Sequence, residues 1–186
     1  MGLETYLLKI EFDEPVITDR IIGLLNSVGL QKLDDHGMNI KEENSLFFEL
    51  RTENGLTEAH CMTNQNKPTI SHFYVRFSVL SLKSVICQTF KVLSDFNDVI
   101  KIRVFDTEIF NHQHQKSKRR KNGNDDCYIP IDAEQFIQNK HGLKKREIIC
   151  GNEEGLIIES GFSTLDFIYK NNLYEKYIGW FKNEIR

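Results

Sequence analysis

The chain has 186 residues, of which 40% are hydrophobic and 11% aromatic, so it can bury a sizeable core and is not a disordered segment. Its formal net charge of −3 excludes a global positive field that would attract nucleic acid or an anionic membrane. No apolar stretch approaches the roughly 18 residues that span a bilayer, and residues 1–14 lack the pattern of a secretory signal. We therefore expect a cytoplasmic protein that does not bind a membrane.

The first part of the chain shows two kinds of apolar pattern in a regular order. Alternating apolar residues predict strands at residues 6–12, 45–51, 70–80 and 100–104. Apolar residues at helical spacing predict helices near 15–28 and 82–96. Residues 52–68 are polar and predict a loop. The order predicts an α+β fold, a ferredoxin-like βαββαβ two-layer sandwich over residues 1–110.

The rest of the chain begins with a polar stretch, because residues 111–126 contain no apolar side chain. This composition predicts a basic loop or linker. Beyond it, residues 127–186 predict a short strand, a helix capped by Asp132, a hairpin around the sequence GNEEG, and a final helical region. We expect these residues to form a small α+β extension that packs on the first part and covers the sheet face opposite the two helices.

One cluster has the residue types of a metal site. Asp106, Glu108, His112 and His114 all occupy even positions, so they would share one face if the strand continued through them. Two carboxylates and two imidazoles suit zinc, manganese or iron. The simpler interpretation is a polar strand end that runs into a solvated loop.

The run that contains Lys116, Lys118, Arg119, Arg120 and Lys121 could neutralise several phosphates of a nucleic acid. It lacks the interleaved aromatic residues of single-strand binders, and Asp125 and Asp126 follow closely. A solvated loop or a contact with an acidic protein are the alternatives.

The strand at 70–80 places His72, Tyr74 and Arg76 on the sheet face away from the helices, and Arg103 falls on the matching face of the next strand. Single-stranded RNA binders of this fold class use that face to stack bases, and here Tyr74, with Phe47 or Phe105, would serve. The ribonucleoprotein sequence motif is absent, so we expect the C-terminal residues to cover the face instead.

The four cysteines lie far apart, with no C-x-x-C pair, so the usual zinc pattern is absent. Cys87 and Cys150 are expected to be buried, and Cys61, in the predicted loop, to be the exposed thiol. The nucleotide-binding glycine motifs and the serine nucleophile motif are also missing, so we expect no cofactor.

These observations favour a non-catalytic protein that binds another protein, with an immunity, antitoxin-like or regulatory role. The expected contact surfaces are the acidic turn with Asp34 and Asp35, and the aromatic C-terminal residues Tyr177 and Trp180. The alternatives are a nucleic-acid-binding protein that uses residues 116–121, and a metal-dependent hydrolase that uses the 106–114 cluster.

Overall fold

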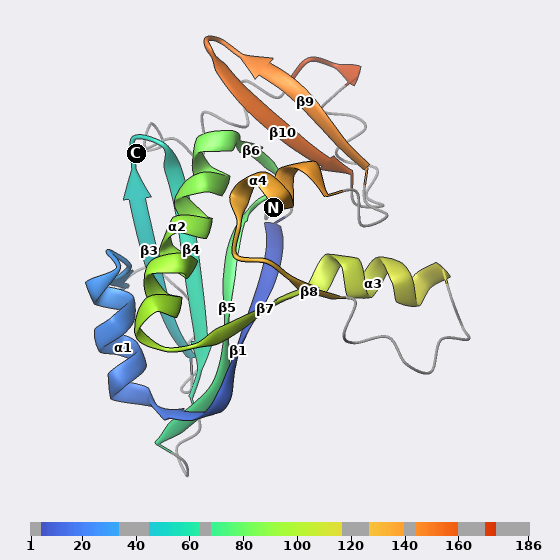
Figure 1. Ribbon diagram of the computed structural model, residues 1–186. Helices are drawn as coiled ribbons and strands as arrows, with labels where there is room; N and C mark the ends of the chain where they lie inside the picture. Colours follow the sequence, from blue (N-terminus) through green and yellow to red (C-terminus); the bar gives the residue numbers. More distant parts are fainter. Residues whose placement is uncertain are drawn as a thin grey trace.

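The structure of the protein is a computed structural model, and it describes residues 5–33, 45–63, 68–116, 127–139, 144–159 and 170–173. Most strands of this part form one antiparallel sheet with the order β2-β3-β4-β5-β1-β7-β8 (Figure 1). These strands are β1 (Thr5–Ile17), β2 (Gln31–Lys32), β3 (Ser45–Thr52), β4 (Gly55–Met62), β5 (Thr69–Ser78), β7 (Ile102–Asp106) and β8 (Tyr128–Ile129).

A second, three-stranded sheet has the order β6-β10-β9. Its strands are β6 (Leu80–Leu82), β9 (Lys144–Cys150) and β10 (Glu153–Glu159). The helices that the described residues form are α1 (Thr18–Ser27), α2 (Lys83–Val99), α3 (Thr107–Lys116) and α4 (Ala133–Gln138). None of them is long and apolar enough to cross a membrane.

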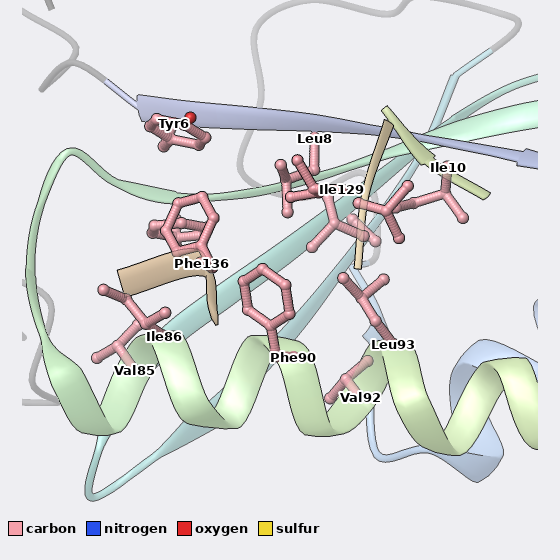
Figure 2. Close-up of a cluster of buried hydrophobic side chains, with 14 of the residues drawn as sticks. Tyr6, Leu8, Ile10, Val85, Ile86, Phe90, Val92, Leu93, Ile129 and Phe136 are labelled. Atoms are coloured by element: carbon pink, nitrogen blue, oxygen red, sulfur yellow. The ribbon is translucent and has the colours of Figure 1, made fainter. Parts of the chain in front are cut away.

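The core lies between the large sheet and the helices α1, α2 and α4, which share one side of it (Figure 1). Tyr6, Leu8 and Ile10 of β1 point toward the buried side chains of α2, as Figure 2 shows. Phe136 of α4 lies between these two elements and packs against the rings of Tyr6 and Phe90. Full burial of an aromatic side chain of this size contributes about 2–3 kcal/mol, so α4 is an integral part of the core.

The helix α1 ends where the sequence predicts. Val28 caps it, and Gly29 follows with a φ of +94°, a conformation that residues with a Cβ rarely adopt. The amide of Leu30 then donates to the carbonyl of Leu25, which satisfies a carbonyl of the last turn.

The prediction of a simple ferredoxin-like βαββαβ sandwich is wrong. The four predicted strands do join one sheet, but that sheet has seven strands, and β4 separates β3 from β5. The segment expected as a loop forms β4, whose buried side chains are small: Thr57, Ala59 and Cys61. Small residues allow α2 to approach this strand, but they give a weak apolar period in the sequence.

The described part of residues 127–186 does not cover the sheet face opposite the helices; residues 160–169 and 174–186 lie outside the described part, so the expected cover stays a prediction. β8 extends the edge of the large sheet beside β7, and α4 packs on the same side as α2. The hairpin of β9 and β10 forms as predicted, and β10 pairs with β6 at the end of the molecule (Figure 1).

Candidate functional site

A line of side chains crosses the face of the large sheet that α1, α2 and α4 leave uncovered. Each member is the Cα partner of the next across neighbouring strands. In order from β3 to β8, the members are Phe47, His60, Tyr74, Lys9, Phe105 and Tyr128. Their neighbours in each strand point into the core, so alternation places these side chains on the opposite face. We call this set the aromatic row.

The rings of the aromatic row contact one another in two groups, one on each side of Lys9. Phe47 and His60 stack with centroids 4.5 Å apart and an interplanar angle of 5°, and His60 lies 6.5 Å from Tyr74. On the other side, Phe105 and Tyr128 meet edge to face with centroids 5.5 Å apart. All of these side chains are half-buried, so the row combines packed rings with accessible edges.

Other side chains extend both groups. His72 meets Tyr74 edge to face at 5.5 Å, and Phe110 of α3 packs against Phe105 at 5.6 Å. Burial lowers the pKa of His72, and the ammonium of Lys9 lowers it further, so neutral pH favours an uncharged imidazole ring there. His72 therefore adds aromatic surface beside Tyr74 without adding a charge.

The cations on and beside this face are paired with carboxylates. Lys9 Nζ lies 2.7 Å from Glu11 Oε1, and Arg76 donates two hydrogen bonds to Glu58, of 3.0 and 2.8 Å. Arg51 lies 3.3 Å from Glu49. Because these charges cancel in pairs, the described side chains of the face leave little surplus positive charge with which to hold phosphates.

Glu11 joins the aromatic row to the sheet edge. It accepts hydrogen bonds from Lys9, at 2.7 Å, and from the Tyr128 hydroxyl, at 2.6 Å. Burial raises the pKa of Glu11, but these hydrogen bonds outweigh that effect, so the pKa of Glu11 is lowered. Arg103 lies 3.7 Å from Glu11 and places its guanidinium 5.0 Å from the centre of the Tyr128 ring. Tyr128 is therefore held in one orientation by two neighbours.

The residues of the predicted metal site are arranged differently from the expectation. The strand does not continue past Asp106; α3 starts at Thr107 and includes Glu108 in its first turn. Asp106 is buried, and its Oδ1 accepts hydrogen bonds from the backbone amides of Glu108 and Ile109, so it serves this helix terminus as a capping residue does. The assumption that one strand continues through all four residues of the predicted metal site is therefore wrong.

Within the described side chains, no group of three or more His, Cys, Asp or Glu residues is placed to hold a metal ion. The side chains of His112 and His114 lie outside the described part, so the metal site stays a prediction. The same holds for the basic run: the backbone of Lys116 ends α3, and Lys118, Arg119, Arg120 and Lys121 lie outside the described residues.

The predicted partner-binding residues Asp34, Asp35, Tyr177 and Trp180 also lie outside the described residues. His72, Tyr74, Arg76 and Arg103 occupy the sheet face on which the sequence predicts them. The aromatic row as a unit was missed, because the partnership of Phe47 with His60 depends on β4, which was not predicted.

The expected exposures of two cysteines are reversed. Cys61 is buried in β4, where burial raises the pKa of its thiol to about 12, so it is not a reactive group. Cys87 is exposed on α2 rather than buried. The apolar stripe of α2 lies on the other side of the helix, through Val85, Ile86, Phe90 and Leu93 (Figure 2).

No protein-family model, curated protein or solved structure matches this chain.

Proposed function

We propose that this protein is a non-catalytic binding module that holds a protein partner on the sheet face of the aromatic row. The observation that carries the proposal is the row itself, with Phe47, His60 and Tyr74 on one side of Lys9 and Phe105 and Tyr128 on the other. Aromatic residues are enriched in protein interfaces and supply a large contact area with little loss of side-chain freedom.

The charges around the row favour a protein over a nucleic acid. Binding of a phosphate backbone requires cations that are available to replace counterions. Lys9 and Arg76 are already paired at 2.7 and 2.8 Å with carboxylates of the same face. A phosphate would have to displace Glu11 and Glu58, whereas a protein surface can pack over the row and leave these pairs intact. We further propose that the protein is cytoplasmic.

The test is quantitative capture from a nuclease-treated lysate of the source cells, on immobilised protein. We compare the wild type with a Tyr74→Ala/Tyr128→Ala double variant and with Asp98→Ala as the matched control. Asp98 is an exposed residue of α2, on the other side of the sheet. We expect at least one protein to be captured by the wild type and the control, and about tenfold less by the double variant.

Loss of two rings could also weaken the sheet, so a second variant is needed. Lys9→Glu places a carboxylate at the centre of the row beside Glu11 and removes no buried apolar group. We expect it to lose the same protein while its thermal unfolding midpoint stays within a few degrees of the wild type. Capture of the same set by every variant would overturn the proposal, and so would row-dependent capture that occurs only when the nuclease is left out.

A further inference from the structure

A groove of about 450 Å³ opens on the helix side of the molecule, away from the aromatic row. It lies between α2, the end of α1 and the hairpin of β3 and β4. Val28, Leu50 and Val92 give it an apolar lining, and polar side chains from α2 and from the hairpin complete it. Its volume is within the range of small-molecule sites, which is about 300–1,000 Å³.

Cys87 lines this groove with an exposed side chain. All four cysteines lie in described parts of the chain, and they differ sharply in access: Cys61 and Cys127 are buried, and Cys150 is half-buried. The groove therefore adjoins the most accessible thiol of the protein, and a thiol reacts as its thiolate only where a reagent can reach it.

Ser84 independently indicates that a hydrogen-bond partner is missing at the wall of the groove. It lies one helical turn before Cys87 and also lines the groove. Its hydroxyl oxygen exposes less than 1 Å² and makes no hydrogen bond with the described residues. A buried hydroxyl without a partner is costly in a folded protein, and rotation of this side chain toward the groove would let a ligand group satisfy it.

The remaining polar groups of the groove suit a small zwitterionic peptide. Lys91 and Asp95 form an exposed ion pair at 2.7 Å, with 73% and 45% of their side chains accessible. Exposed pairs of this kind contribute little to stability, so both groups are available to a ligand. The ammonium can hold a carboxylate and the carboxylate can hold an amine, while the amide of Asn54 can bond to a peptide group.

We propose that this groove is a modification site, in which Cys87 forms a mixed disulfide with a small peptide thiol of the glutathione type. In the step, the thiol of Cys87 loses its proton and its sulfur attacks one sulfur of the low-molecular-weight disulfide. A new sulfur–sulfur bond forms, the bond of the reagent breaks, and the leaving thiolate takes up a proton. Cys87 is oxidised, and the other half of the reagent is reduced to its thiol.

The first experiment locates the adduct. The purified full-length protein is incubated with glutathione disulfide and followed by intact mass and peptide mapping. We expect one glutathionyl group per chain, on Cys87, and none on Cys87→Ser. The Cys150→Ser variant is the matched control and should be modified as the wild type is. An adduct mainly on Cys150, or no adduct under conditions that modify a cysteine-containing peptide, would overturn the proposal.

The second experiment distinguishes a groove that binds the peptide from a thiol that is only accessible. Rate constants are measured with glutathione disulfide and with hydroxyethyl disulfide, which carries no charge. We expect the double variant Lys91→Ala/Asp95→Ala to react about tenfold more slowly with glutathione disulfide and at an unchanged rate with hydroxyethyl disulfide. Lys101→Ala, an exposed residue that is not part of the groove lining, serves as control. Equal effects of the double variant on both reagents would contradict the proposed groove.

Discussion

Tyr6 and Asp106 are 100 residues apart in the sequence, yet the Tyr6 hydroxyl donates a 2.5 Å hydrogen bond to Asp106 Oδ2. The same carboxylate accepts from the first-turn amides of α3, so it links β1, the end of β7 and the start of α3. Burial raises the pKa of Tyr6, and the adjacent carboxylate raises it further. Burial also raises the pKa of Asp106, although its three hydrogen bonds oppose this.

Substitution of Asp106 should therefore cost stability in proportion to the hydrogen bonds that it removes. Asp106→Ala leaves the buried Tyr6 hydroxyl unpaired and removes the acceptor at the start of α3, for about 2–4 kcal/mol. Asp106→Asn keeps an acceptor for the amides and offers its NH₂ to the tyrosine oxygen, so it should cost less than about 1.5 kcal/mol. Urea unfolding of the three proteins measures both values, and equal losses would show that the hydrogen bonds do not hold this junction.

Lys145 of β9 gives a prediction for the pH dependence of stability. It donates a hydrogen bond to the carbonyl of Phe136, its Nζ lies 4.2 Å from the centre of that ring, and burial lowers its pKa to about 8 despite the nearby Asp106. Between the folded pKa and the ordinary value of 10.5, the unfolded chain binds more protons than the folded one. The contribution of Lys145 to the free energy of unfolding therefore rises with pH across this window.

The size of this rise is limited because Lys145 is only half-buried; we expect at most about 1 kcal/mol from pH 8 to pH 9.5. Cys61 acts in the opposite direction, because burial keeps its thiol protonated above the ordinary value of 9.0. The measurement is therefore the difference between the unfolding curves of the wild type and Lys145→Met at each pH. A difference that stays constant across the window would contradict the lowered pKa.

The close packing around Gly155 predicts that one added methyl group lowers the stability of the protein. A Cβ added at this position of β10 would lie 2.9 Å from Ile148 Cγ1 and 3.4 Å from the carbonyl oxygen of Ser81. Gly155→Ala should destabilise the protein by about 1–3 kcal/mol, because Ile148 of β9 must shift. Gly23→Ala is the matched control: nothing lies within 4 Å in α1, and alanine should stabilise the helix by about 0.5–1 kcal/mol. Thermal unfolding of both variants tests the packing of the small sheet.

The sequence predicted local elements well where a long apolar period is present. Phe73, Val75 and Phe77 alternate clearly and form the buried side of β5, and the stripe of α2 is equally regular. β4 was missed because its buried positions are Thr57, Ala59 and Cys61, which carry little of the apolar signal. The end of β7 was missed for a different reason: Asp106 caps a helix, and a polar residue at that place is also compatible with a continuing strand.

The aromatic row could be predicted only in part. Alternation within one strand places Tyr74 on the open face, but the neighbours of Tyr74 depend on strand order and register. His60 and Lys9 lie beside it because β4 and β1 flank β5, a relationship between segments far apart in the chain. The register between strands is fixed because all strands of the sheet must bury their opposite face together. The sequence of a single segment therefore does not show which residues become its neighbours.

Site-specific photo-crosslinking from the aromatic row in the source cells shows whether this sheet face binds a protein. A photoreactive phenylalanine analogue replaces Tyr74 in one version of the protein and Asp98, an exposed residue of α2, in the other. We expect a discrete crosslinked protein from position 74 that is absent from position 98 and is lost when Lys9→Glu is added. Equal crosslinking from both positions, or no protein adduct from position 74, would contradict the assignment of this sheet face as the binding surface.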